Sequence, residues 1–317
     1  GPTGTNAVEA AMKLARKVTK RTNIIAFTNG YHGVTQGALA ATGNKKNRVG
    51  PEIQLTGVSR AAFDGYLGDG YDTADILEKM LSDPSSGIDE PAAILFEPIQ
   101  GEGGLNVAGI KWMQKIAAIA KRHGALLIAD EIQTGCGRTG TFFAFEAAGI
   151  EPDLVTVSKS ISGFGLPMAL LLIKPEHDIW LPAQHNGTFR GNNHAFVTGR
   201  VMLEKFWFDG ALMDDVAAKS KLVTERLQRI ADMIPEARLK GRGMMQGVDV
   251  VSGGLAEVIC RRAFSDGLII ETSGPNHEVI KILAALTTPE DLLHRGFDIL
   301  EGAAKMTMAA RSRMAAA

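Results

Sequence analysis

The sequence predicts an α/β protein built on a mostly parallel β-sheet that helices cover on both faces. Short apolar runs, each the length of a buried strand, alternate along the chain with segments whose apolar residues recur at helical spacing. Such alternation is typical of sheets in which neighbouring strands run the same way. Ligands of these sheets bind at the carboxyl ends of the strands. We therefore expect the functional residues at that edge of the sheet.

The composition argues against several other classes of protein. The 317 residues carry a formal net charge of -1 without a basic stripe, so neither nucleic acid nor an anionic membrane is expected as a partner. No apolar stretch reaches the length of a membrane span. Cys136 and Cys260 fit neither a disulfide framework nor a metal site, so we expect a cytoplasmic protein without a metal.

A glycine-rich turn and a helical pattern open the chain. Residues 1–5 form the turn, and the apolar residues of 6–18 recur at helical spacing, with Thr5 or Asn6 as the expected N-cap. The free N–H groups at the start of such a helix suit a phosphate. Because this turn resembles the inside of a domain, we expect an N-terminal part to precede it.

The next segment combines a strand with two loops. A short strand at 23–27 leads into the loop 28–33. The flat rings of Tyr31 and His32 in this loop could stack on a planar heterocycle, or they could lie on an ordinary surface loop. Residues 43–70 are polar without periodicity and are expected to form a long loop.

Strands and helices continue to alternate up to about residue 209. We expect strands over 92–97, 125–129 and 166–173, a strand that ends before the loop 158–163, and helices over 110–122 and 194–206. The later pattern is that of an α+β domain, with helices over 214–233, 255–266 and 290–305 and strands within 237–251 and 279–283. The predicted domains are therefore a large one, 1–209, and a small one, 210–317.

Lys159 is the residue around which the predicted site is built. It directly follows a buried strand and stands between small hydroxyl residues. Beside crowded backbone an ammonium group would lose its water, its pKa would fall, and the neutral amine could form a Schiff base with a carbonyl. The alternative is a lysine that extends from a strand end into water.

Asp130 supplies the second part of the predicted site. A carboxylate at the end of a buried strand favours a positively charged hydrogen-bond donor, and a protonated pyridine nitrogen is one. All the groups that pyridoxal phosphate requires then have a candidate: Lys159 for the aldehyde, Asp130 for the ring nitrogen, Tyr31 or His32 for the ring face, and the amides of Gly4 and Thr5 for the phosphate.

Two segments carry a resemblance to a known family. Asp-Glu-Ile-Gln-Thr-Gly-Cys-Gly-Arg-Thr-Gly at 130–140, followed by Ser-Lys-Ser-Ile-Ser-Gly at 158–163, resembles the signature of the class III, or ornithine-type, pyridoxal-phosphate aminotransferases. Segments at 31–33, 97–103 and 186–192 occur in the order that this family uses. The resemblance implies the aspartate-aminotransferase fold, fold type I, with a large cofactor domain and a smaller C-terminal α+β domain.

The resemblance also implies roles around the cofactor ring. Lys159 would hold the aldehyde and, once released, would act as the base that moves the substrate proton. Asp130 would pair with the ring nitrogen, Gln133 would contact the phenolic oxygen, and Tyr31 would stack on the ring.

Further implied roles concern the phosphate. Gly4 and Thr5 would hold it, and Thr188 would reach the phosphate of the other subunit. Such a borrowed residue makes a homodimer the smallest active unit.

Two stretches narrow the expected reaction. Residues 1–17 and 186–193 closely resemble the diaminobutyrate-forming members of the family, from ectoine synthesis, and Asn6 is a departure from the family pattern that they share. The resemblance implies transfer of the amino group of L-glutamate to L-aspartate 4-semialdehyde, which gives L-2,4-diaminobutyrate and 2-oxoglutarate. The alternatives are another class III ω-aminotransferase, of ornithine, 4-aminobutyrate or acetylornithine type, a related aminomutase, or a non-catalytic protein on the same fold.

The expected substrate-binding residues are Glu102, Arg190 and Lys281. In many class III ω-aminotransferases an arginine binds the α-carboxylate of glutamate and is masked by a glutamate. Lys281 stands at the corresponding place, with Glu102 as its possible partner, and it lacks the two-pronged guanidinium of arginine. The alternatives are a strand lysine in water and, for Arg190, an ordinary surface residue of the phosphate loop.

Overall fold

The computed structural model describes residues 2–49 and 54–315, and the chain divides into two compact units. The first unit comprises residues up to Ile99, Ala108–Cys136 and Thr141–Ala211. The second comprises Gln100–Val107, Gly137–Gly140 and the chain from Leu212 onward. The two short segments belong to it because Gly274 N donates to Glu102 O and Met244 N donates to Arg138 O. The sequence had placed both segments in the large domain, and the boundary at 209/210 stays a prediction.

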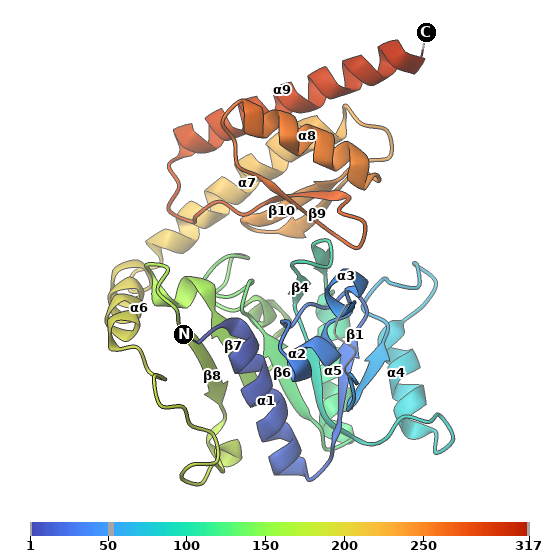
Figure 1. Ribbon diagram of the computed structural model, residues 1–317, viewed down its shortest axis with the longest axis vertical. Coiled ribbons are helices and arrows are strands. Elements are labelled where there is room, and N and C mark those ends of the chain that lie inside the picture. Colours follow the sequence, from blue (N-terminus) through green and yellow to red (C-terminus); the bar gives the residue numbers. More distant parts are fainter. Residues whose placement is uncertain (1, 50–53, 316–317) are drawn as a thin grey trace. The chain divides into compact units, whose positions relative to one another are not determined.

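A six-stranded sheet forms the middle of the first unit (Figure 1). Its order is β2-β1-β3-β6-β7-β8, in which all pairs are parallel except the antiparallel pair of β7 and β8. The prediction of a mostly parallel sheet is therefore confirmed. The strands are β1 (Asn23–Phe27), β2 (Val58–Ala61), β3 (Pro91–Phe96), β6 (Leu126–Asp130), β7 (Leu154–Ser158) and β8 (Ala169–Ile173).

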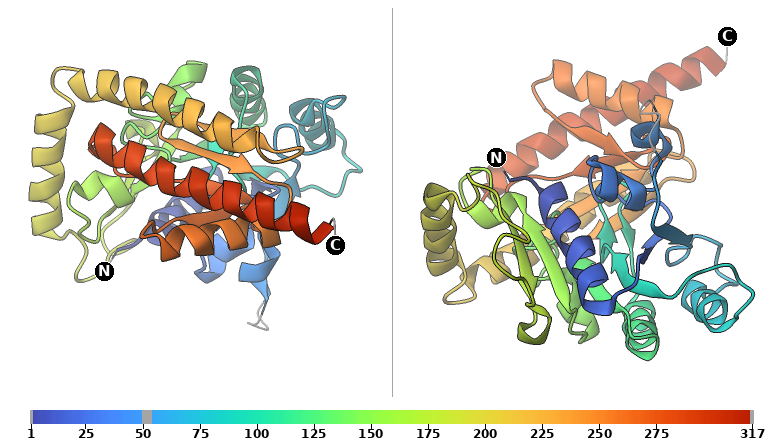
Figure 2. Two further views of the ribbon diagram at one scale, coloured as in Figure 1. Left: turned by 90° about the horizontal axis from the view of Figure 1, so that it is seen from above. Right: turned by 60° about the horizontal axis from the view of Figure 1, so that its bottom comes forward.

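Helices cover both faces of this sheet, as Figures 1 and 2 show. One face packs on α1 (Gly4–Thr19) and α2 (Gln36–Ala41), and the other packs on α4 (Thr73–Ser82) and α5 (Ile110–Arg122). Successive strand side chains point to opposite faces, so Ile24 joins the core under α1 while Ile25 joins the core under α4 and α5. The other elements of this unit are α3 (Lys45–Arg48), α6 (Asn193–Phe206) and the 3-10 helices η1 (Ala144–Ala148), η2 (Lys159–Ser162) and η3 (Pro175–His177). The short strand β4 (Ile99–Gln100) spans the boundary of the units, and β5 (Asn106–Val107) belongs to the second unit.

Three sequence-based expectations need correction. The N-cap of α1 is Thr3 rather than Thr5 or Asn6, because the side-chain oxygen of Asn6 reaches back to accept the N–H of Thr3 at 2.9 Å. The expected long loop 43–70 contains α3 and β2, and its residues 50–53 lie outside the described chain. The expected loop 158–163 begins with the last strand residue and continues as η2.

A four-stranded antiparallel sheet forms the middle of the second unit, with the order β11-β12-β10-β9. Figure 2 shows α7, α8 and α9 over one face of it, where their apolar side chains form one core with those of β10 and β12. The predicted α+β character of this part is confirmed. Its elements are α7 (Ala211–Ala231), β9 (Arg238–Arg242), β10 (Met245–Asp249), α8 (Gly253–Ser265), β11 (Glu271–Ser273), β12 (Val279–Ile282) and α9 (Glu290–Ala315).

No helix in the described ranges is both long enough and apolar enough to span a membrane.

Candidate active site

Four neighbouring strands of the first unit bring the predicted residues to one edge of the sheet. The order β1-β3-β6-β7 places the carboxyl ends of these parallel strands side by side. Ligands of parallel sheets bind at this edge. The residues found there are Tyr31 and His32 after β1, Glu97 after β3, Asp130 at the end of β6 and Lys159 directly after β7.

Asp130 is a buried carboxylate with most of its acceptor positions in use. Its Oδ1 accepts hydrogen bonds from Thr156 Oγ1 at 3.1 Å and from the backbone N–H of Ile132 at 3.2 Å. Its Oδ2 lies 2.7 Å from His32 Nδ1. A carboxylate offers about four acceptor positions, so these three bonds leave room for one further donor. The residue therefore fits the N–H of a protonated pyridine ring.

His32 supports Asp130 rather than offering a ring face. The imidazole is 3% exposed, and because a carboxylate can only accept, Nδ1 carries the hydrogen that it shares with Asp130. The alternative in which His32 stacks on a cofactor ring is therefore wrong for this structure. Stacking by Tyr31 stays a prediction, and the backbone N–H of Tyr31 donates to Glu97 Oε2 at 2.9 Å.

Lys159 starts the η2 turn directly beyond β7. Its backbone has a φ of 53°, a left-handed conformation that is strained for a residue with a β-carbon. The side chain is exposed in this structure, so the expected loss of water around the ammonium group is wrong for the chain by itself. The turn explains this, because it carries the residue out of the buried sheet. Gln133, half-buried after β6, is a predicted contact of the phenolic oxygen.

The first turn of α1 offers the expected phosphate site. Gly4 and Thr5 are its first two residues, where backbone N–H groups have no carbonyl within the helix to bind and the helix dipole is positive. A β-carbon added at Gly4 would lie 2.9 Å from Ile132 Cδ1, so this turn packs against the segment that follows Asp130. The phosphate end and the ring-nitrogen end of the predicted site are therefore neighbours in the first unit.

Glu131 is a fully buried carboxyl group that the sequence analysis overlooked. It accepts hydrogen bonds from the hydroxyl of Thr134 and, at 3.1 Å, from the backbone N–H of Phe145. Burial raises the pKa of Glu131 to about 7 despite these bonds. The available signal was its place as the second acidic residue after an apolar strand.

Lys281 of the second unit lies between two carboxylates. Its Nζ is 2.8 Å from Glu102 Oε1 and 3.0 Å from Glu271 Oε1, and its side chain is 0% exposed. The alternative of a strand lysine in water is therefore wrong. Glu271 is present because β11 pairs with β12 in a register that places Glu271 opposite Lys281. The sequence analysis missed it because β11 has only three residues.

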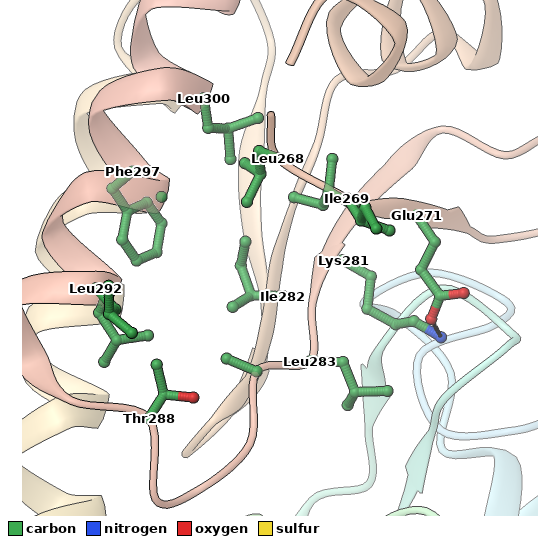
Figure 3. A pocket seen from close by; sticks show the side chains of 14 residues that line it. Leu268, Ile269, Glu271, Lys281, Ile282, Leu283, Thr288, Leu292, Phe297 and Leu300 are labelled. Carbon is green, nitrogen blue, oxygen red and sulfur yellow. Dashed lines mark ion pairs between the residues drawn. The ribbon is translucent and has the colours of Figure 1, made fainter. Parts of the chain in front are cut away.

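A pocket of about 430 Å³ lies beside this ion pair. Figure 3 shows Lys281 and Glu271 at one end of it, while apolar side chains of α9, of β12 and of the segment before β11 line the rest, among them Phe297, Ile282 and Leu268. An ion pair is stronger beside such an apolar wall than in open water. Binding of a substrate carboxylate by Lys281 stays a prediction.

The loop between β8 and α6 holds the remaining predicted residues, Thr188 and Arg190. Both are exposed and line a pocket of about 460 Å³ together with Trp180 and His185. Arg190 Nη1 lies 2.6 Å from His185 Nε2, which must accept this bond. Burial, followed by the nearby Arg190 and Lys13, lowers the pKa of His185. The predicted roles of Thr188 and Arg190 remain predictions.

Comparisons with known proteins identify the family of the chain. The sequence model of the class-III aminotransferases matches residues 2–304. A diaminobutyrate--2-oxoglutarate transaminase of Vibrio cholerae is 55% identical over 303 residues, which cover 95% of this chain and 73% of the relative. One of Bordetella parapertussis is 53% identical over 304 residues, 95% of this chain and 70% of the relative.

Solved structures agree on the fold. A transaminase from the marine bacterium Virgibacillus superposes with a TM-score of 0.88 at 18% identity, and the match covers 98% of this chain and 75% of that one. The fold is thus that of the pyridoxal-phosphate-dependent transaminases. The family model and the identity to these relatives go further than fold, and the chain belongs to the class III aminotransferases, whose cofactor is pyridoxal phosphate.

Proposed function

We propose that the protein transfers the amino group of L-glutamate to L-aspartate 4-semialdehyde and so forms L-2,4-diaminobutyrate and 2-oxoglutarate. The observation that carries this substrate pair is the identity of 51–55% to relatives named diaminobutyrate--2-oxoglutarate transaminase, over 95% or more of the chain. The site supports the chemistry, since Asp130 at the end of β6 and Lys159 directly after the neighbouring β7 lie at one edge of the sheet.

Each predicted residue at the carboxyl edge of the six-stranded sheet has a distinct proposed role. Pyridoxal phosphate, when bound, supplies an electron sink for the substrate bond next to the amine nitrogen. Asp130 keeps a positive charge on the ring nitrogen, and His32 keeps the Asp130 carboxylate in place. The first turn of α1 binds the phosphate. Lys159 holds the cofactor through its Nζ, and the same atom takes the proton from the substrate carbon when the lysine is released.

Lys281 is the proposed site for a substrate carboxylate. Glutamate carries a carboxylate next to its reacting carbon, and the arginine that Lys281 replaces binds this carboxylate in many class III ω-aminotransferases. Lys281 is a buried cation whose partner Glu102 is partly exposed, and a substrate carboxylate can replace Glu102 at Nζ. Arg190 is a second candidate for this task.

A homodimer is the proposed assembly. The described chain exposes large apolar side chains between η2 and the start of α7: Phe164, Phe189, Val197 and Phe208, of which Phe189 is 95% exposed. Exposed apolar surface of this kind marks a contact site, and Phe189 adjoins Thr188, the residue expected to reach the other subunit. We expect Val197→Lys to shift the protein toward the monomer in sedimentation, whereas Val258→Lys on α8 should not. Equal behaviour of the two variants would contradict this interface.

The cellular location and the domain boundaries are also proposals. A cytoplasmic location fits a sequence whose two cysteines, Cys136 and Cys260, give no disulfide framework. Division into a large cofactor domain, 1–209, and a small domain, 210–317, fits the two compact units apart from the short segments named above.

The cofactor spectrum tests the reaction. We expect glutamate alone to convert the bound cofactor to its amine form, and aspartate 4-semialdehyde to restore it faster than the ω-aldehydes derived from ornithine or 4-aminobutyrate. Lys159→Ala should abolish turnover and the absorbance of the lysine-bound cofactor, while Lys121→Ala on the exposed side of α5 should change neither. An unchanged spectrum with glutamate would exclude it as donor, and preference for another aldehyde would point to another class III ω-aminotransferase.

A further inference from the structure

Thr5 belongs to a chain of hydrogen bonds within the first unit. Its Oγ1 lies 2.6 Å from Thr35 Oγ1, and Thr35 Oγ1 donates to Glu9 Oε1 at 2.8 Å. The same oxygen of Glu9 accepts the backbone N–H groups of Gly37 at 2.8 Å and Ala38 at 3.1 Å. Glu9 of α1 therefore holds the loop that follows His32 as well as the start of α2.

The number of hydrogens fixes the direction of each bond. The Glu9 carboxylate can only accept, so the single hydroxyl hydrogen of Thr35 points to Glu9. Thr35 Oγ1 must then accept from Thr5, and the hydroxyl hydrogen of Thr5 points to Thr35. Toward any other neighbour, the Thr5 hydroxyl presents lone pairs.

Gly33 keeps the Thr5 side chain in this position. A β-carbon added at Gly33 would lie 2.4 Å from Thr5 Oγ1 and 2.5 Å from Thr5 Cβ, and Gly33 has a φ of 121°. The backbone of the loop therefore passes directly over Thr5. The loop that carries His32, the partner of Asp130, thus also sets the orientation of the Thr5 hydroxyl.

We infer that Glu9 and Thr35 are positioning residues that set how the cofactor phosphate is held, an inference that rests on the phosphate site proposed above. Phosphate oxygens accept hydrogen bonds, so they gain nothing from a hydroxyl whose hydrogen points elsewhere. The phosphate is held by the backbone N–H groups of Gly4 and Thr5, and the Thr5 hydroxyl is withheld from it. Breaking the chain at Thr35 frees the Thr5 hydrogen for the phosphate.

Thr35→Val tests this, because it removes the acceptor for Thr5 and keeps the shape of the side chain. The apoprotein is titrated with pyridoxal phosphate and with pyridoxal, which lacks the phosphate, and its thermal stability is measured. We expect the preference for pyridoxal phosphate over pyridoxal to rise about tenfold or more, as one added charge-assisted hydrogen bond allows. The apoprotein should become slightly less stable, because Glu9 loses the hydroxyl donor of Thr35 and keeps only the N–H groups of Gly37 and Ala38. If Thr35 had only a structural role, the substitution would lower both the preference for pyridoxal phosphate and the thermal stability of the apoprotein.

A second substitution separates the remaining outcomes. Thr5→Val is made both in the parent and in Thr35→Val. It should reduce the preference for pyridoxal phosphate at least about fivefold more in Thr35→Val, because only in that variant does the Thr5 hydroxyl reach the phosphate. Thr19→Val, at the other end of α1 where the hydroxyl donates to Ala15 O, is the matched control and should leave the preference unchanged.

The positioning role would be overturned if Thr5→Val reduced the preference for pyridoxal phosphate equally in the parent and in Thr35→Val. It would also be overturned if Thr35→Val alone reduced this preference. Neither result would contradict the proposed phosphate site. A parent protein that binds pyridoxal as tightly as pyridoxal phosphate would contradict the phosphate site itself, and the positioning role with it.

Discussion

The Nδ1 atom of His32 lies 2.7 Å from Oδ2 of Asp130, and both side chains are buried. The pair joins the loop after β1 to the end of β6, across the intervening strand β3. A buried hydrogen bond to a charged group contributes about 1.5–3 kcal/mol, so His32 has a direct effect on how firmly the carboxylate is held in place.

His32→Leu is expected to lower kcat about tenfold or more, because the Asp130 carboxylate loses its strongest donor. The KM for glutamate should change less, since no substrate contact is removed. Steady-state kinetics with the cofactor fully bound measure both. His123→Leu, which removes a half-buried histidine at the end of α5, is the control and should leave kcat near the parent value. A kcat unaffected by His32→Leu would contradict the supporting role.

Asp130→Asn should lower kcat by about two orders of magnitude or more, since a neutral amide cannot stabilise a positive ring nitrogen. Retention of the cofactor should fall less, because the contacts at the start of α1 persist. Kinetics and dialysis against buffer without cofactor separate the two effects. Asp153→Asn, at the opposite end of the sheet where the carboxylate accepts Leu127 N, provides the comparison. A near-normal rate in Asp130→Asn would rule out the ring-nitrogen role.

Long amphipathic elements could be predicted from the sequence. The helix over 110–122 has the predicted bounds because its apolar residues recur regularly and Gly124, with a φ of 62°, follows its end. Asp130 and Lys159 could be placed at one edge because each follows a buried strand. By contrast, β2 was missed because Val58–Ala61 is half-buried at the sheet edge and shows no apolar pattern.

Contacts between distant segments could not be predicted in the same way. Nothing in the sequence pairs His32 with Asp130, since their contact depends on the order of β1, β3 and β6 in the sheet. The exposure of Lys159 depends on its left-handed backbone, which the alternation of apolar residues does not encode. Glu271 reaches Lys281 only through the register of β11 and β12.

Lys281→Met should separate stability from substrate binding. Removing one partner of a buried ion pair is costly when the other charge stays buried, but Glu102 and Glu271 are 36% and 60% exposed, so water can solvate them. We expect the free energy of unfolding to change by about 1 kcal/mol or less, while the KM for glutamate rises about tenfold or more. Lys240→Met on β9 is the control. An unchanged KM would remove Lys281 from the substrate site.

Glu131 should make stability depend on pH in the neutral range. Its pKa is raised from 4.5 to about 7 in the folded protein, so the folded state binds this proton more tightly than the unfolded chain does. The resulting stabilisation is fully present below pH 4.5, declines as the pH rises from 4.5 to about 7, and is lost above about pH 7. Its size is about 3 kcal/mol, because each unit of pKa difference corresponds to about 1.4 kcal/mol.

Glu131→Gln removes this titration but keeps a side chain of the same shape. Relative to the variant, the parent protein should therefore lose about 3 kcal/mol of unfolding free energy between pH 4.5 and pH 8. Urea unfolding at a series of pH values measures the difference. Glu146→Gln is the matched control, because Glu146 is exposed on η1 and accepts the N–H of Phe143 in the segment that also binds Glu131. Parallel curves for the parent and Glu131→Gln would show that the carboxyl titrates alike in the folded and unfolded chains, and burial would then not control its protonation.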